Sequence, residues 1–433
     1  MGCTPMKRYL MQDLVDWKND AERKPMILKG ARQVGKTWLM CEFGRQYYKK
    51  TAYISFFNNK RLAKVFDDDW DLERLLMNLG LEAKTEITAG DTLIILDEIQ
   101  ACPRALEALK FFCEAAPEYH IIAAGSLLGI AIHEGISFPV GKVNMLDLSP
   151  MNFCEFLEAQ GQEKLAELIN NKNYKLLGDI HEQCIFWLKN YYFTGGIPAA
   201  VKCFAKNKNY QSVRKIQNAI LEQYENDFGK HIKTRIAKTR LIWHSIPVQL
   251  AKENKKFFFG QVKQGARMRD FDESIEWLCD CGLAKKVYKV SKPAVPLKAY
   301  AELNCFKLFM FDTGLLGALS ELEAQTILEG SAIFTEFKGA LTEQFVLQEL
   351  TSQNKYKPYY YVSESNKYEI DFIIQKDNNV VPVEVKAGSS LQAKSLKYYR
   401  EKFQPCAAVR ISMAEYKKES GLLNLPLYAV SML

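Results

Sequence analysis

The chain has 433 residues, of which 48% are hydrophobic and 25% are charged, and its formal net charge is +7. These are ordinary values for a globular protein, and they exclude a disordered or low-complexity chain. The length exceeds the size at which one hydrophobic core usually keeps growing, so it predicts about two or three domains. The mild basic excess is compatible with a polyanionic partner but does not identify one.

No segment has the features of a membrane helix or a secretory signal. The longest apolar stretch, residues 121–132, is interrupted by Gly125 and Ser126 and is shorter than the roughly 18 residues that a membrane helix needs. Residues 1–14 contain no apolar core followed by a small-residue cleavage site. Eleven cysteines, five histidines and the lack of a C-x-x-C pair predict reduced thiols and no zinc site. We therefore expect a cytoplasmic protein without a membrane contact.

A phosphate-binding loop is predicted at residues 30–37, which match the pattern G-x-x-x-x-G-K-[ST] at every fixed position. Residues 25–28 before it are typical of a buried strand, and residues 38–43 after it suit a helix. In such a loop Lys36 reaches the β and γ phosphates, and the Thr37 hydroxyl binds Mg²⁺. The alternative is a Gly-rich turn without this function. We predict ATP and Mg²⁺ as cofactors, with these nucleotide-binding residues: Gly30, Ala31, Arg32, Gln33, Val34, Gly35, Lys36 and Thr37.

A second apolar run, residues 92–96, ends at Asp97 and Glu98. A carboxylate at the carboxyl end of a central parallel strand is well placed to organise Mg²⁺, so Asp97 is predicted to bind nucleotide and metal. Glu98 is predicted to be catalytic by polarising the water that attacks the γ-phosphate. A solvated strand end is the alternative for both. Ser126, after another predicted strand, either senses the γ-phosphate or caps the next helix.

Alternating strand and helix signals define the fold class of the N-terminal part. Strands are predicted at residues 51–56, 120–124 and 143–148, and a helix is predicted at residues 103–116. This alternation predicts a parallel sheet with helices on both faces. The predicted class is α/β, with an N-terminal parallel-sheet P-loop domain, a helical and winged-helix middle segment, and a C-terminal α/β domain.

The middle of the chain predicts two kinds of structure. Residues 157–240 are rich in helix formers and predict a helical connector. Residues 271–281 predict an amphipathic helix, and residues 283–290 predict a strand followed by a turn and a second extended stretch. This order suits a winged-helix-like domain at residues 241–333. Its basic flank contacts either DNA phosphates or a protein.

Near the C-terminus, residues 368–374 and 380–386 predict a β-hairpin. Because strand side chains alternate between faces, Asp371, Glu384 and Lys386 can converge on one face. Two carboxylates hold a divalent cation well, and an ammonium group beside it can hold or activate a water for attack on phosphorus. The three residues are therefore predicted to catalyse phosphodiester hydrolysis, with Asp371 and Glu384 as metal ligands. The alternative is an exposed cross-strand ion pair.

Together, four motifs resemble the AAA-type ATPase module of a large prokaryotic family. The motifs are residues 30–37, 96–100, 125–126 and 148–156. Members of that family carry a C-terminal domain of unknown function, often with a restriction-endonuclease-like end, and the resemblance covers nearly the whole chain. The family has an arginine after the glycine that here is Gly141, whereas this sequence has Lys142, which lacks the bidentate fork of arginine.

The C-terminal pattern resembles the PD-(D/E)XK nuclease core, onto which Asp371, Glu384 and Lys386 map. The resemblance implies a further acidic metal ligand, Glu343, on a predicted helix at residues 335–350. A following helix at about residues 392–403 carries basic side chains that can meet the DNA backbone: Lys394, Lys397 and Arg400.

We therefore divide the chain into an AAA-like P-loop ATPase domain, a helical connector, a winged-helix-like domain and a PD-(D/E)XK nuclease-like domain. Their boundaries are 1–156, 157–240, 241–333 and 334–433. The predicted function is an ATP-hydrolysing protein that acts on DNA, with a metal-dependent nuclease-like domain controlled by nucleotide state. The alternative is an ATP-dependent scaffold that binds DNA or protein through an inactive nuclease-like domain. DNA is the expected partner, and the sequence is also compatible with a protein partner or a homo-oligomer.

Overall fold

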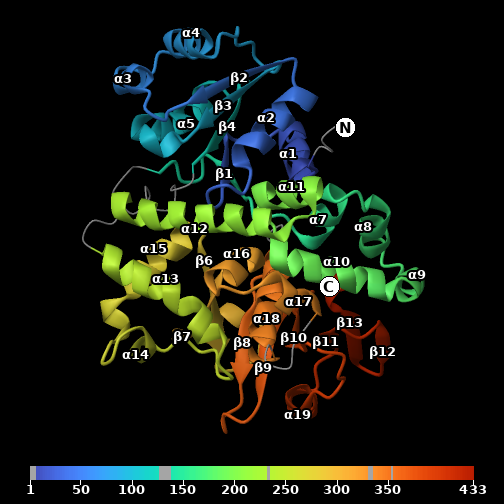
Figure 1. Cartoon of the computed structure of the whole chain (residues 1–433). Coiled ribbons are helices and arrows are strands. Elements are labelled where there is room, and N and C mark those ends of the chain that lie inside the picture. The colour runs from blue at the N-terminus through green and yellow to red at the C-terminus, as the bar shows by residue number, and fades with distance from the viewer. Residues whose placement is uncertain (1–5, 126–137, 232–234, 330–334, 353–354) are drawn as a thin grey trace. The chain divides into compact units, whose positions relative to one another are not determined.

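The computed structural model describes residues 6–125, 138–231, 235–329, 335–352 and 355–433. The chain forms two compact units, one mainly of residues 8–149 and the other mainly of residues 150–433. Figure 1 shows the elements of each unit. The connector, winged-helix-like and nuclease-like segments that the sequence suggests fall in the second unit, except residues 280–282, which cluster with the first.

The first unit alternates strands and helices. Its elements are α1 (Leu10–Asn19), β1 (Met26–Lys29), α2 (Lys36–Tyr47), β2 (Lys50–Ser55), α3 (Lys60–Asp67), α4 (Leu72–Ala83), β3 (Thr92–Asp97), α5 (Pro103–Ala115), β4 (His120–Ala124) and β5 (Asn144–Asp147). The strands form one sheet in the order β2-β3-β4-β1-β5, and every neighbouring pair is parallel. The predicted strands and the parallel sheet are confirmed.

Both faces of strand β3 are buried, because a parallel sheet is covered by helices on each side. Ile94 and Leu96 pack in one core with Leu106 and Phe112 of α5. The residues that alternate with them are also fully buried, including Leu93. An apolar strand interior, residues 93–96, is stable in this setting, and the acidic residue Asp97 comes where the strand ends.

The second unit begins with helices. They are α7 (Phe153–Ala159), α8 (Glu163–Asn170), α9 (Tyr174–Asp179), α10 (His181–Thr194), α11 (Pro198–Asn207), α12 (Tyr210–His231), α13 (Ile236–Leu250), α14 (Phe259–Val262) and α15 (Asp272–Asp280). The predicted helical character of this segment is confirmed. Among the described residues, none of the helices combines the length and apolar character that a membrane-spanning helix requires.

The remaining elements build a mixed sheet with helices. They are β6 (Ala284–Val290), β7 (Ala301–Met310), α16 (Thr313–Leu319), α17 (Ala324–Glu329), α18 (Thr335–Thr351), β8 (Tyr359–Val362), β9 (Glu369–Lys376), β10 (Asn379–Val385), α19 (Lys394–Phe403), β11 (Ala408–Ser412), β12 (Lys417–Glu419) and β13 (Leu422–Pro426). The eight strands have the order β12-β13-β11-β10-β9-β8-β6-β7.

The predicted hairpin is present as the antiparallel pair β9–β10, in which Phe372 lies opposite Val383. Strand β11 returns parallel to β10 after helix α19. The helix, strand, turn and strand expected for a winged helix are also present, as α15, β6 and β7. However, β6 pairs with β8 as well as with β7, so both strands expected for the winged helix belong to the eight-stranded sheet. The winged-helix assignment itself stays a prediction.

Candidate functional site

The phosphate-binding loop lies between β1 and α2, as the sequence predicts. Gly30 has φ of 144°, and a Cβ atom there would lie 2.3 Å from the carbonyl oxygen of Leu148, so only glycine fits. Gly35 has φ of 97° and immediately precedes α2, and Gln33 also has a positive φ, 64°. The loop backbone therefore turns tightly into the N-terminus of a helix, where N–H groups are available to an anion.

Lys36 is buried inside this loop. Its Nζ donates hydrogen bonds of 2.8 Å to the carbonyl oxygens of both Gly30 and Ala31. Burial lowers the pKa of Lys36 to about 8, although the carboxylates of Glu98 and Asp97 oppose that shift. A phosphate group can replace the two carbonyl acceptors and supply the negative charge that a buried ammonium group needs.

Asp97 lies next to the loop at the end of β3, and three donors hold its carboxylate. Oδ2 accepts hydrogen bonds from the Thr37 hydroxyl at 2.7 Å and the Tyr53 hydroxyl at 3.0 Å, and Oδ1 accepts one from the Glu98 N–H at 3.0 Å. Oxygen atoms of Thr37 and Asp97 are thus adjacent. Hard oxygen donors of this kind suit Mg²⁺, which is commonly bound by few protein ligands together with the phosphates.

Glu98 adopts a left-handed backbone conformation, with φ of 53°, and its carboxylate accepts a hydrogen bond from the Gln100 side chain. Ser126 lies outside the described residues. Lys142 is partly exposed and forms an ion pair with Glu114 at 2.8 Å.

Sequence reasoning missed two residues that hold this site together. Arg8 is buried, and its guanidinium donates to the carbonyl oxygens of Val34 at 2.7 Å and Ser149 at 2.6 Å. Tyr53 contacts Asp97 from strand β2. Neither residue belongs to a local motif, because both reach the loop only through the tertiary fold.

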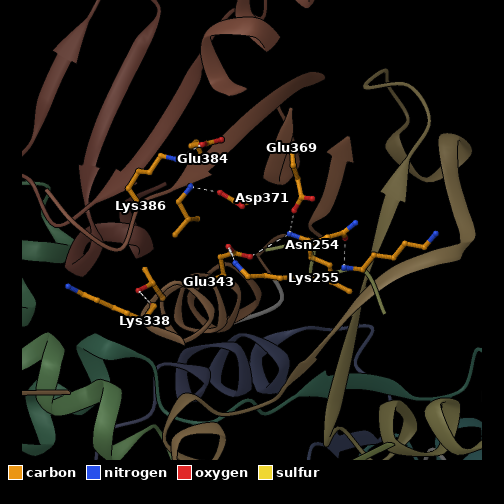
Figure 2. Close-up of polar contacts among 12 residues, drawn as sticks. Asn254, Lys255, Lys338, Glu343, Glu369, Asp371, Glu384 and Lys386 are labelled. Carbon is orange, nitrogen blue, oxygen red and sulfur yellow. Dashed lines mark hydrogen bonds and ion pairs between the residues drawn. The ribbon is translucent and has the colours of Figure 1, made fainter. Parts of the chain in front are cut away.

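A second group of ionisable side chains lies in the other unit. We call Glu343, Glu369, Asp371 and Glu384 the carboxylate centre. Glu343 comes from α18, Glu369 and Asp371 from β9, and Glu384 from β10. Figure 2 shows these side chains with Lys255 and Lys386 around them. The structure therefore brings together the C-terminal residues that the sequence suggested.

Asp371 and Glu384 are linked across the hairpin. Asp371 Oδ2 accepts a hydrogen bond of 2.7 Å from the N–H of Val385, the residue after Glu384. Glu384 is buried, with Oε1 2.8 Å from Nζ of Lys386. Its other oxygen, Oε2, is buried without a hydrogen-bond partner in the part of the chain that the structure describes. A buried carboxylate oxygen without a donor is costly, so it is a position where a cation would be stabilising.

The pKa values in the centre reflect burial and crowding. Burial, followed by the charges of Glu343 and Glu384, raises the pKa of Asp371 well above its usual range. Burial also raises the pKa of Glu384, and Lys386 only partly opposes that rise. A divalent cation would relieve both shifts by neutralising the carboxylates.

Glu343 differs from the other two predicted metal ligands. Its carboxylate forms ion pairs with Lys255 and with Lys307, the latter at 3.5 Å. Burial alone would raise the pKa of Glu343, but the two lysines lower it. Among the described residues no group of three His, Cys, Asp or Glu side chains has the arrangement of a metal site. The pair Asp371 and Glu384 still suits Mg²⁺, which is often bound by one or two carboxylates with water and phosphate oxygens completing its shell.

Lys255 and Lys307 were not predicted from the sequence. Lys307 lies in strand β7, is completely buried, and contacts Glu369 at 2.5 Å. Burial alone would lower its pKa, but Glu369, Glu343 and Asp371 together raise it. The available signal was a single lysine within the apolar run of residues 305–310, since an unpaired buried charge is rarely tolerated. No comparable signal marks Lys255.

A strand, a Gly-rich loop with a buried lysine, a helix and an acidic strand end define the first unit as an AAA-type P-loop ATPase domain. The comparison with protein families agrees, since residues 22–157 match the family model described as AAA domain. Residues 185–326 and 338–430 match two models described as domains of unknown function, DUF8612 and DUF4143. A search of curated proteins finds no match.

The comparison with solved structures gives matches of low similarity, one of them a Walker-type ATPase. The Walker-type ATPase of Pyrococcus abyssi is 14% identical, with a TM-score of 0.46 over 73% of this chain and 96% of that chain. The RuvB Holliday junction branch migration motor of Thermotoga maritima is 14% identical, with a TM-score of 0.28 over 74% and 84% of the two chains. The Aeropyrum pernix Orc1 protein, solved in complex with DNA, is 13% identical, with a TM-score of 0.29 over 72% and 90%. Because these TM-scores are low, the class rests on the loop geometry and the family model.

Proposed function

We propose that this protein binds and hydrolyses ATP in its first unit and hydrolyses phosphodiester bonds of DNA at the carboxylate centre of its second unit, in the cytoplasm and under control of its nucleotide state. The observation that carries the nuclease proposal is the buried Oε2 atom of Glu384, which is unpartnered among the described residues and lies beside Asp371 and Lys386.

For ATP hydrolysis, the roles follow from the positions of four side chains. Lys36 exchanges its two carbonyl partners for phosphate oxygens, and the adjacent oxygens of Thr37 and Asp97 hold Mg²⁺. Glu98, which follows Asp97 at the end of β3, orients the attacking water. Positioning and charge stabilisation account for most of the rate enhancement in this class of reaction.

For phosphodiester hydrolysis, Asp371 and Glu384 hold the divalent cation, which when bound polarises the phosphate and lowers the pKa of a water. Lys386 lies next to Glu384, where its ammonium group orients the water or stabilises negative charge on the phosphate. Burial alone would lower the pKa of Lys386, but Glu384 and Asp371 raise it, so the side chain stays positively charged.

Basic residues of α19 follow the carboxylate centre in the chain and supply the contact to the DNA backbone. Arg400 lies in the last turn of this helix and donates to the carbonyl oxygen of Ser420 at 2.7 Å. Lys397 lies one turn earlier and is largely exposed. Contacts of this type are independent of base sequence and weaken as salt concentration rises.

The test is cleavage of linear, nicked, branched and single-stranded DNA with Mg²⁺ or Mn²⁺, with and without ATP. We expect wild-type protein to cleave at least one substrate and Lys386→Ala to lose about 100-fold or more of that rate. Lys397→Ala serves as a matched control, with a smaller loss that shrinks as salt concentration rises. A dependence on ATP would show that the first unit controls the second. Equal cleavage by wild type and Lys386→Ala would contradict the assignment.

The ion pairs of Glu343 favour a second candidate function. Because two lysines neutralise this carboxylate, the centre also suits a protein that binds DNA or a protein partner in an ATP-dependent manner without cutting. Absence of cleavage on every substrate, with ATP hydrolysis intact and DNA binding measurable, would favour this scaffold function.

A further inference from the structure

The charges at the carboxylate centre come from two parts of the chain. Glu343, Asp371 and Glu384 belong to residues 338–430 of this chain, which match one family model, whereas Lys255 and Lys307 belong to residues 185–326, which match another. Both lysines form ion pairs with Glu343, and Figure 2 shows Lys255 beside it. The centre is therefore a composite of the two segments.

The two lysines differ in how firmly the fold holds them. Lys307 lies within a paired strand, is completely buried, and also contacts Glu369 and the ring of Tyr360. Lys255 lies in the turn between α13 and α14, where the preceding residues 252–254 are exposed. Its side chain nevertheless reaches into the centre and is only 12% exposed. Of the two, Lys255 is the one that can leave the centre without breaking a strand.

The paired state of Glu343 limits the carboxylate oxygens that a cation can use. A cation that bound Glu343 would have to displace Lys255, and its own positive charge would be repelled by Lys255 and Lys307. Glu384 is paired with Lys386, and its other oxygen has no partner among the described residues. The charges of Lys307 and Lys255 also act on Asp371, but neither lysine forms an ion pair with it in the described part of the chain.

The geometry points to Lys255 as a positioning residue that withholds Glu343 from the divalent cation. Asp371 and Glu384 are then the carboxylate ligands, and the turn between α13 and α14 sets the affinity of the centre for the cation. This inference rests on the proposed nuclease function, since it concerns the same cation. A movement of that turn would raise cation affinity and thereby activate the centre.

The experiment measures Mn²⁺ binding to the full-length protein by electron paramagnetic resonance, without nucleotide. Bound Mn²⁺ that is present in wild type but absent in Asp371→Asn is assigned to the carboxylate centre. Lys255→Met removes the charge and keeps the aliphatic stem, so we expect this part of the binding to tighten by about tenfold or more. Lys255→Arg keeps the charge, and the exposed Lys252→Met is the matched control from the same turn. Both should bind Mn²⁺ within about twofold of wild type.

A second variant keeps the inference testable if Lys255→Met does not fold. Glu343→Gln removes the partner of Lys255, and because Glu343 is not a ligand in this arrangement, it should retain the Mn²⁺ binding that Asp371→Asn loses. Equal loss in both variants would overturn the inference.

The outcomes distinguish a failure of the Lys255 inference from a failure of the proposed metal-dependent nuclease function. If wild type shows binding that depends on Asp371, but Lys255→Met binds no tighter, the inference fails and the cation site stands. If neither wild type nor Lys255→Met shows binding that depends on Asp371, the proposed metal-dependent function fails.

Discussion

The hydroxyl of Thr37 lies 2.7 Å from Asp97 Oδ2, although the two residues are 60 positions apart in the chain. The contact joins the first turn of α2 to the end of β3 and thereby places side by side the two oxygen atoms that we propose as Mg²⁺ ligands. Parallel strands produce this arrangement because their carboxyl ends meet at one edge of the sheet. The predictions for the ATPase domain depend on it.

Replacing Lys36 by alanine should abolish ATP binding. Lys36 is the buried cation of the loop, and its removal leaves the phosphates without that positive charge. We expect the Kd for ATP, measured by calorimetry, to rise by about 100-fold or more. Lys49→Ala, at an exposed ion pair of the same unit, should leave the Kd unchanged. Equal affinities for wild type and Lys36→Ala would refute the phosphate-loop assignment.

Replacing Glu98 by glutamine should separate binding from turnover. The change preserves the shape of the side chain and its position beside Asp97 but removes the carboxylate that orients water. We expect steady-state ATP hydrolysis to fall by about 100-fold or more while the Kd for ATP stays close to that of wild type. The exposed Glu118→Gln is the control. A normal turnover rate in Glu98→Gln would show that another group orients the water.

Replacing Lys307 by methionine should destabilise the second unit by about 3–5 kcal/mol, because Glu369 and Glu343 would lose a buried positive partner. Denaturant unfolding measures this change. The double variant Lys307→Met with Glu369→Gln should recover part of the loss, since it removes the charge that is left unpaired. If the single and double variants are equally stable, the loss of stability in Lys307→Met comes from packing and not from the unpaired charge.

His120 should stay neutral to unusually low pH. Its ring is buried beside Tyr48, whose hydroxyl lies 2.7 Å from Nδ1, and burial with the charges of Arg23 and Lys18 lowers its pKa to about 4. An unfolded histidine titrates near 6.5, so between these values the unfolded chain binds more protons than the folded one. The stability that comes from keeping His120 neutral is therefore fully present above pH 6.5 and is lost as pH falls toward 4.

The contribution of His120 should be about 1–2 kcal/mol after allowance for solvent screening. Nuclear magnetic resonance of labelled histidine rings measures the pKa directly, with His120→Asn to assign the signal. Unfolding of the same variant should depend less on pH between 4 and 6.5 than unfolding of wild type does, whereas the exposed His244→Asn should behave like wild type. A His120 signal that titrates near 6.5 would contradict the prediction.

Sequence patterns predicted the first unit well, because its signals are local. Apolar runs of strand length, helix signals between them, and a glycine-rich loop followed by Lys36 and Thr37 each depend on neighbouring residues. The sheet and its parallel pairing followed from their alternation and are confirmed. The hairpin at β9 and β10 was predicted for the same reason, since strand alternation places Asp371 and Glu384 on neighbouring strands.

The sequence by itself determined the P-loop class, the parallel sheet and the acidic hairpin, because each depends on residues close together in the chain. Only the tertiary structure decided that β6 and β7 join the C-terminal sheet and that Arg8 and Tyr53 support the nucleotide site. It also decided that two lysines pair with Glu343. A buried carboxylate requires a positive partner, but no local pattern specifies which of the chain's 58 lysines and arginines will lie beside it after folding.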